Sequence, residues 1–201
     1  SDLEIKFVNK NEGWILGWNY LLHTTDGGNS WEEIKTLPKF SNISFSHIFF
    51  TENGILLTIS DSNLTVTSSN AGKDWQINNI GITLNDVSFY GNKGFSISQS
   101  NLNICISLNG GQTWGAGLYN EDVQYISSLI AIDSANLCMV GMNGKIFLSS
   151  DAGDSWKAIS TNSSRTFASG SFSDELNGWV VASGSGIMRT TNGGQDWLFD
   201  T

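Results

Sequence analysis

The octapeptide TTDGGNSW at residues 24–31 decides the fold, because the same pattern returns four more times along the chain. The other copies are SSNAGKDW at 68–75, SLNGGQTW at 107–114, SSDAGDSW at 149–156 and TTNGGQDW at 190–197. All share the pattern Ser/Thr, any residue, Asp/Asn, Gly/Ala, Gly, any residue, Ser/Thr/Asp, Trp. Their tryptophans lie 44, 39, 42 and 41 residues apart, a spacing that suits four short strands and their turns.

Each repeat also has an internal order, which predicts four strands, here called A, B, C and D. Strand A is an apolar-x-apolar segment, B opens on an apolar residue, C runs into the octapeptide, and D leaves from its tryptophan. Asp, Asn and Gly suit the tight turn between C and D. We therefore predict an all-β fold, a five-bladed β-propeller with four antiparallel strands and one octapeptide per blade. The blades are expected at about 1–38, 39–80, 81–120, 121–161 and 162–201, closing as one domain in a monomer.

Composition narrows the class of partner. The chain has 19 acidic and 10 basic residues, a formal charge of −9, which disfavours nucleic acid because phosphate binding relies on clustered Lys and Arg. No apolar run is long enough for a membrane span. Cys105 and Cys138 lie in apolar segments, where buried thiols and a disulfide are both compatible with the sequence. We expect a secreted, periplasmic or cell-surface protein in preference to a cytoplasmic one.

The octapeptides resemble Asp-boxes, also called bacterial neuraminidase repeats. The stretches GWILGWNYLLHTTDGGNSW at 13–31 and GWVVASGSGIMRTTNGGQDW at 178–197 resemble the propellers of the photosystem II stability and assembly factor-like family. This resemblance covers essentially the whole chain and implies a propeller fold. Asp-boxes occur in sialidases, sortilin-type receptors, lectin-like proteins and assembly factors, so the resemblance leaves the function open.

The predicted binding face is the side of the propeller that carries the B-to-C turns and the D-to-A connectors. The octapeptides lie on the opposite side, where their residues are committed to turn geometry. Aromatic rings interleaved with Asn and Asp suit a polypeptide segment or a sugar. The predicted binding residues are Trp18, Tyr20, Phe40, Asp61, Tyr119, Asp122 and Arg165, with Asn19, Asn63, Gln99, Asn101 and Glu121 beside them.

Some other residues have side chains that an enzyme could use. Glu4, His47 and Asp86 precede the A strands and, with Asp122, are the carboxylates and histidine that a glycoside hydrolase could use. A sialidase of the usual kind needs three arginines, whereas this chain has Arg165 and Arg189.

Structural roles explain the remaining conspicuous residues. The octapeptide tryptophans and Asp/Asn residues, together with Trp14 and Trp179, are predicted to serve packing and turns, and His23 to be a surface or edge side chain. The sequence has no metal-ligand spacing and indicates no cofactor. We expect a non-enzymatic scaffold for a protein or peptide partner, with lectin-like glycan binding and glycoside hydrolysis as alternatives.

Overall fold

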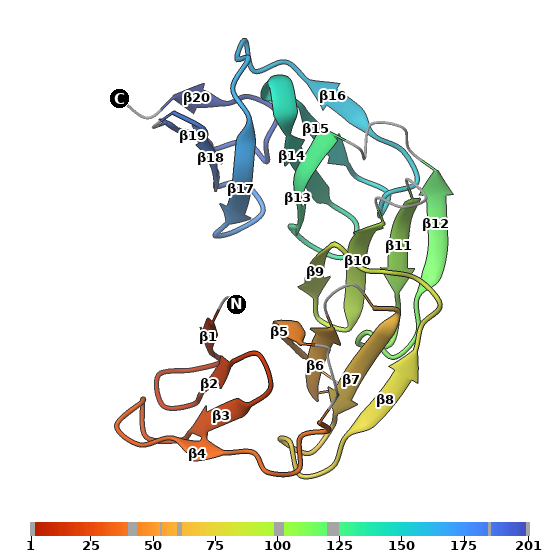
Figure 1. Cartoon of the computed structure of the whole chain (residues 1–201). Helices are drawn as coiled ribbons and strands as arrows, with labels where there is room; N and C mark the ends of the chain where they lie inside the picture. The colour runs from red at the N-terminus through yellow and green to blue at the C-terminus, as the bar shows by residue number, and fades with distance from the viewer. Residues whose placement is uncertain are drawn as a thin grey trace. The chain divides into compact units, whose positions relative to one another are not determined.

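The computed structural model describes residues 3–39, 44–52, 54–59, 62–98, 103–119, 125–184 and 186–199, without the side chains of 116–119. Within these residues, the strands form five antiparallel sheets of four strands each, and the strands of every sheet are adjacent in chain order (Figure 1). The predicted all-β class is therefore confirmed. No helix in these ranges is long and apolar enough to cross a membrane.

The first two sheets follow the predicted order of strands. Sheet one consists of β1 (Glu4–Phe7), β2 (Gly13–Leu16), β3 (Leu21–Thr24) and β4 (Glu32–Glu33). Sheet two consists of β5 (Phe45–Thr51), β6 (Gly54–Ile59), β7 (Leu64–Ser68) and β8 (Gln76–Asn79). In both, the octapeptide connects the third strand to the fourth, as the Gly-rich pattern predicts.

The remaining three sheets repeat this order. Sheet three consists of β9 (Asp86–Tyr90), β10 (Lys93–Ser98), β11 (Asn103–Ser107) and β12 (Gly115–Tyr119). Sheet four consists of β13 (Ile126–Ala131), β14 (Leu137–Gly141), β15 (Ile146–Ser149) and β16 (Lys157–Ile159), with a short helical turn η2 (Met142–Gly144). Sheet five consists of β17 (Phe167–Phe172), β18 (Gly178–Ala182), β19 (Gly186–Thr190) and β20 (Leu198–Phe199).

The chain divides into two compact units, the first made of Ser1–Leu84 with Ser107–Trp114 and the second of Asn85–Ile106 with Gly115–Thr201. The octapeptide of sheet three thus belongs with the first unit. Its Gly111 carbonyl accepts a hydrogen bond of 3.2 Å from the Thr65 hydroxyl in β7. Leu56 lies so close to Gly111 that a Cβ there would come within 2.5 Å of it. An octapeptide can therefore pack on the sheet that precedes its own.

The core of the first unit lies between sheets one and two. Trp14, Leu16 and Leu21 of sheet one are at most 2% exposed and belong to one cluster with apolar residues of sheet two. Alternating strand residues point to opposite faces, so these three share one face of sheet one. The opposite face of that sheet carries Ile5 and Phe7, which are 58% and 48% exposed.

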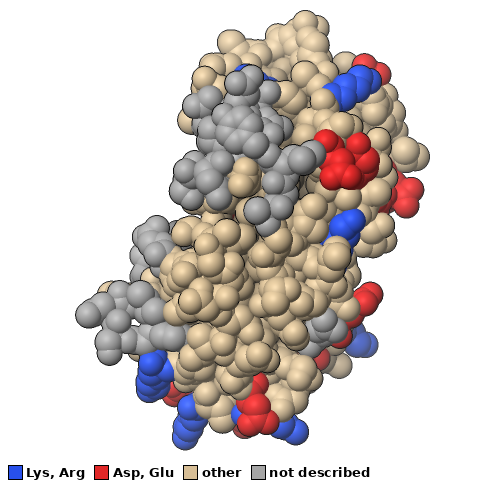
Figure 2. Space-filling model, turned by 90° about the vertical axis from the view of Figure 1, so that its right-hand side faces the viewer, with Lys and Arg blue, Asp and Glu red and all other residues tan. Residues whose placement is uncertain are grey.

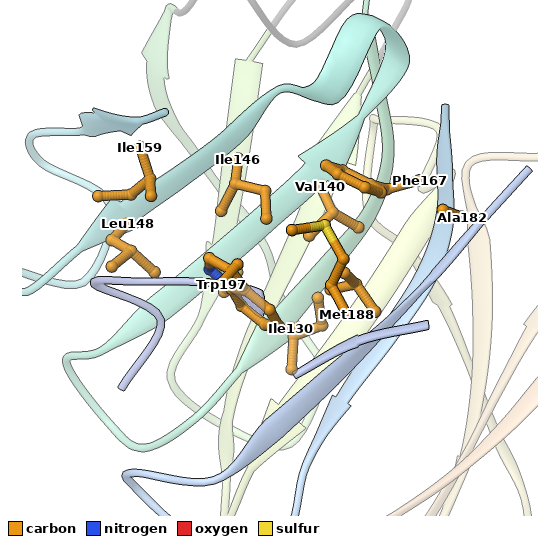
Figure 3. Packing of buried hydrophobic residues seen from close by; sticks show 11 residues of the cluster. Ile130, Val140, Ile146, Leu148, Ile159, Phe167, Ala182, Met188 and Trp197 are labelled. Carbon is orange, nitrogen blue, oxygen red and sulfur yellow. The ribbon is translucent and has the colours of Figure 1, made fainter. Parts of the chain in front are cut away.

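The second unit has the same kind of core between sheets four and five. Figure 3 shows Val140 and Ile146 of sheet four beside Met188 of sheet five and Trp197 of the last octapeptide. A separate cluster, which includes Phe95 and Leu137, packs sheet three on sheet four. Each interface is built from alternate residues of the strands, as in stacked sheets generally.

Trp179 corrects one prediction. It opens its strand at the same repeat position as Trp14 and was expected in the core, but it is 41% exposed. Neighbouring Val181 and Ile187 on the same face of sheet five are 50% and 46% exposed. The other face of this sheet packs on sheet four, and burial of a strand residue depends on a covering partner as much as on its repeat position.

His23 is more enclosed than predicted for a surface or edge residue. Its ring stacks on Trp14 with 3.8 Å between ring centroids, and its Nε2 lies 3.1 Å from Glu12 Oε1. The side chain is 19% exposed. His23 therefore covers the indole of Trp14 and extends the core toward the surface.

Cys105 and Cys138 are both fully buried and are not joined in a disulfide. Burial raises the pKa of the Cys138 thiol to about 12, so this side chain stays protonated and packs as a small apolar group.

Charged groups are sparse on the surface. Figure 2 shows a side of the molecule that is mostly uncharged, in keeping with the 14% of charged residues in the chain.

Candidate functional site

The octapeptide turns use their polar groups internally. The first hydroxyl donates to the third-position Asp or Asn and accepts from the fifth-position glycine N–H, as when Thr24 bonds Asp26 at 2.8 Å and Gly28 at 3.0 Å. The same bonds recur in the other four turns, whose first residues are Ser68, Ser107, Ser149 and Thr190. Hydrogen bonds from the Ser30 hydroxyl, the Ser30 N–H and the Thr24 hydroxyl lower the pKa of Asp26 to about 2. Such groups are committed to the fold, as predicted.

A second repeated turn, between the first and second strands, was not recognised in the sequence. Asp133 Oδ1 accepts the backbone N–H groups of Ala135 and Asn136, both at 2.7 Å, and Asp174 accepts those of Leu176 and Asn177 in the same way. Asn9 makes the equivalent bonds in sheet one. The spacing Asp/Asn-x-x-Asn/Glu is the signal that could have revealed it.

These turns and the octapeptides lie at the same edge of their sheets. The N–H of an octapeptide residue donates to the third residue of the neighbouring turn: Gly27 to Asn11 at 2.8 Å, Ala152 to Ala135 at 2.8 Å, and Gly193 to Leu176 at 2.9 Å. We call this edge the octapeptide edge. The turns between second and third strands, with the links between sheets, form the connector edge, which is where the binding residues were predicted.

On the connector edge of the first unit, Trp18 stands out. Its side chain is 61% exposed, while its carbonyl accepts a hydrogen bond of 3.2 Å from the N–H of Phe45 in sheet two. The turn is closed by a bond of 2.9 Å from the Gly17 N–H to the Tyr20 carbonyl. The Tyr20 ring lies over Gly17, where a Cβ would come within 2.3 Å of it. Trp18 is therefore an exposed aromatic on a fixed backbone, and Tyr20 partly supports the turn.

On the connector edge of the second unit, sheet four carries a pocket of about 720 Å³. Its walls are residues 143–147, around the turn between β14 and β15, and residues 158–164, in and after β16. Asn143 and Asn162 hold left-handed backbone angles, with φ of 56° and 52°. Asparagine adopts such angles more readily than other non-glycine residues, so both positions suit tight turns.

Hydrogen bonds tie the two walls together. The Thr161 hydroxyl donates to the Gly144 carbonyl at 3.0 Å, and the Gly144 N–H donates to the Arg165 carbonyl at 2.7 Å. Lys145 places its Nζ 4.3 Å from the Tyr125 ring centroid. The pocket thus combines backbone amides, side-chain amides and hydroxyls with an apolar floor of Ile146 and Phe147. No local sequence pattern marks this pocket, because its two walls meet only in three dimensions.

Arg165, predicted as a carboxylate contact, is exposed next to this pocket. Its Nη1 donates to the Gly184 carbonyl at 3.1 Å, and its guanidinium carbon lies 5.4 Å from the Phe199 ring centroid. The guanidinium is therefore held over sheet five. Phe40, Asp61 and Asp122 lie outside the described residues, as do Gln99, Asn101 and Glu121, and Tyr119 ends β12 with its side chain undescribed.

The carboxylates considered for catalysis hold strands together. Glu4 Oε2 accepts the Ile48 N–H at 2.8 Å and Oε1 lies 2.9 Å from Lys6 Nζ, which itself donates to the Ile48 carbonyl at 2.7 Å. His47 Nδ1 lies 3.7 Å from Glu4 Oε2. Burial raises the pKa of Glu4, but His47, Lys6 and the Ile48 N–H lower it to about 2, so Glu4 is a poor general acid.

Asp86 likewise connects two neighbouring sheets, here within the second unit. Its Oδ2 accepts the Leu129 N–H at 2.5 Å, and the Ser88 hydroxyl accepts the Ala131 N–H at 2.9 Å. These contacts favour a structural role for both carboxylates. Within the described ranges, no group of three or more His, Cys, Asp or Glu side chains could hold a metal ion.

Glu4 gives a testable pH dependence. Because its pKa in the folded protein is lowered from 4.5 to about 2, the stability it contributes is present above about pH 4.5 and is lost as the pH falls toward 2. Because Glu4 is partly exposed and solvent screens its charge, we expect a contribution of about 1–2 kcal/mol. We expect Glu4→Gln to unfold at lower urea concentration at pH 7, and the difference from the unsubstituted protein to shrink between pH 4.5 and 2. A difference independent of pH would contradict the ionic role.

Comparisons with known proteins support the resemblance seen in the octapeptides. The family model of the photosynthesis system II assembly factor YCF48 matches residues 1–82. The structure titled YCF48 bound to D1 peptide is 18% identical with a TM-score of 0.56, and the match covers 99% of this chain and 80% of that one. YCF48 from Cyanidioschyzon merolae is 16% identical with a TM-score of 0.53, covering 98% and 83%.

A glycoside hydrolase also shares the fold. The GH74 enzyme of Niastella koreensis is 19% identical with a TM-score of 0.71, but the match covers 96% of this chain and 30% of that one. No curated protein matches significantly. The chain is thus a propeller-like protein that resembles the photosystem II assembly factor family, and likeness at this level of identity defines the fold alone.

Proposed function

We propose that this protein is a non-enzymatic scaffold that recognises a protein or peptide segment through its connector edge. The observation that carries the proposal is Trp18, a large aromatic that is 61% exposed on a turn fixed by backbone hydrogen bonds. Exposed aromatics on rigid backbone are common anchors of protein recognition, because little conformational entropy is lost on binding. The likeness to YCF48 bound to D1 peptide supports a peptide as the partner.

The pocket on sheet four is a second candidate site, which lies on the connector edge of the second unit. Asn143, Asn162 and the Ser160–Ser164 segment offer donors and acceptors for a peptide backbone, above the apolar Phe147. Arg165 beside it suits a carboxylate. The opposite edge has fewer groups to offer, since the octapeptide hydroxyls and carboxylates already bond within their turns.

The experiment is a selection of peptides that bind the protein from a random-sequence display library, followed by affinity measurement. We expect Trp18→Ala to weaken peptides that bind the first unit about tenfold or more, and Ser164→Trp, which fills the pocket, to weaken those that bind the second unit by as much. Lys73→Ala, an exposed change in an octapeptide, is the matched control and leaves affinity unchanged. Thermal midpoints within error of each other would show that the fold is intact. The proposal would be refuted if neither Trp18→Ala nor Ser164→Trp changed the affinity of the selected peptides. It would also be refuted if glycans displaced every selected peptide.

We also propose that the five sheets are the blades of one closed propeller in a monomer. Trp179, Val181 and Ile187 of sheet five occupy the repeat positions of Trp14, Leu16 and Leu21 in sheet one. The first three are exposed and the last three are buried against sheet two. The exposed apolar face of sheet five therefore has the character of one half of an interface like that between sheets one and two.

The less buried face of sheet one matches the face of sheet five that packs on sheet four. Its Ile15 and Leu22 occupy the repeat positions of Val180 and Met188, through which sheet five packs on sheet four. Each uncovered face therefore repeats a face that is covered elsewhere in the chain. If the ring is closed, replacing Trp179 by Ala should lower the free energy of unfolding about as much as replacing Trp14, and this comparison tests closure.

A further inference from the structure

The octapeptide edge of the second unit carries a pocket of about 840 Å³ that the proposed function does not use. It lies where the first strands of sheets three, four and five end, and its apolar lining comes from Tyr90, Ile132, Phe172 and Leu176. Tyr90 is 50% exposed and Leu176 is 57% exposed. All of these residues belong to one compact unit, so the pocket is complete within it.

Leu176 is not needed for the turn in which it lies. Its carbonyl accepts the octapeptide N–H of Gly193, and the same task is done by Asn11 in sheet one and Ala135 in sheet four. The position therefore requires a backbone carbonyl and no particular side chain. An exposed leucine here contributes apolar surface that the fold does not demand, which is typical of a contact residue.

The surroundings of the pocket are acidic. Hydrogen bonds from the side chain of Asn177 and the N–H groups of Leu176 and Asn177 lower the pKa of Asp174 to about 2, so it stays ionised. Glu175, next to it, is exposed and also lines the pocket. The turns of this edge add the carboxylates of Asp133, Asp151, Asp154 and Asp196.

Two lysines at this edge are engaged elsewhere. Lys93 Nζ donates to the Ser134 carbonyl at 2.9 Å, and Lys157 Nζ donates to Gln195 Oε1 at 2.9 Å. Within the described residues, Asp174 and Glu175 form no ion pair. The pocket thus presents an apolar floor beside carboxylates, in a protein whose net charge is −9.

We propose that this pocket is a second recognition site, which binds an apolar side chain of a peptide segment flanked by basic residues. The apolar side chain contacts Phe172 and Leu176, and the flanking cations lie near Asp174 and Glu175. Charge complementarity of this kind gives specificity and faster association, and it rejects acidic segments. This pocket is separate from the connector edge, so its test does not depend on the proposed function.

The test uses a fluorescent, end-blocked heptapeptide with one Leu between two Arg in a Gly/Ser background, titrated with the full chain. We expect saturable binding that weakens at least about tenfold when Glu175→Ser and Leu176→Ala are combined. This variant copies the Asp133–Asn136 turn of sheet four, so its backbone bonds are kept. Peptides with Leu replaced by Ser, or Arg by Glu, should also bind at least about tenfold more weakly.

Two controls separate the pocket from general attraction between opposite charges. Asp154→Ser removes one exposed carboxylate of the same edge that does not line the pocket, and it should leave affinity unchanged. Trp18→Ala tests the connector edge: weakened binding in this variant would place the peptide there and overturn the proposal. Equal weakening by Asp154→Ser, unchanged binding in the combined variant, or absence of saturable binding would overturn the proposal.

Discussion

Trp14→Ala is expected to lower the free energy of unfolding by about 3–5 kcal/mol, the range for deleting a large buried aromatic. Trp14 is 1% exposed, belongs to the cluster between sheets one and two, and carries the stacked ring of His23. Its loss removes contacts to both sheets and leaves a cavity. Urea unfolding followed by far-UV circular dichroism measures the effect.

Trp179→Ala is the matched variant, because both tryptophans open the second strand of their sheets. If sheet five is covered in a closed ring, removing Trp179 costs about as much as removing Trp14. If its face stays open, the cost is that of a surface change, about 0.5 kcal/mol. Light scattering at several protein concentrations gives the control, since a mass above the 21.9 kDa of one chain would assign the covering partner to a second copy.

The octapeptides predicted the strands well because their residue requirements are local. A hydroxyl, an Asp or Asn, and glycines at fixed spacing determine the turn between third and fourth strands wherever they occur. The same reasoning could have found the turns at Asn9, Asp133 and Asp174. It could not separate Trp14 from Trp179, because their burial depends on which sheet covers them and not on repeat position.

The candidate binding residues were less predictable. Exposure of Trp18 follows from its place in a turn, so the sequence was sufficient there. The pocket beside Gly144 depends on hydrogen bonds to Thr161 and Arg165, which are distant in the chain. Leu176 could have been noticed by comparing turns, since its equivalents are Asn11 and Ala135.

Trp197→Ala is likewise expected to cost about 3–5 kcal/mol, and more than Trp75→Ala, although both end an octapeptide. Trp197 is 6% exposed and its Nε1 donates to the Gly194 carbonyl at 2.9 Å. Trp31, Trp114 and Trp156 make the same bond. Trp75 is less buried, and its Nε1 is enclosed without a hydrogen-bond partner in the part of the chain that the structure describes.

The corresponding Phe variants isolate the indole N–H from the ring. Trp197→Phe loses a hydrogen bond and should lower stability by about 1 kcal/mol. Trp75→Phe removes a buried donor that has no acceptor, so we expect no loss or a gain of up to about 1 kcal/mol. An equal loss in both variants would contradict the difference between the two turns.

We attribute this difference to a second donor that uses the same acceptor. In the second octapeptide, the Gly72 carbonyl accepts a hydrogen bond of 2.5 Å from the Thr36 hydroxyl. Thr36→Val removes this donor, after which the Gly72 carbonyl is available to the Trp75 indole. A double-mutant cycle with Trp75→Phe should then show coupling of about 0.5 kcal/mol or more, since the indole N–H becomes useful only when Thr36 is replaced. Strict additivity would show that the two donors do not compete.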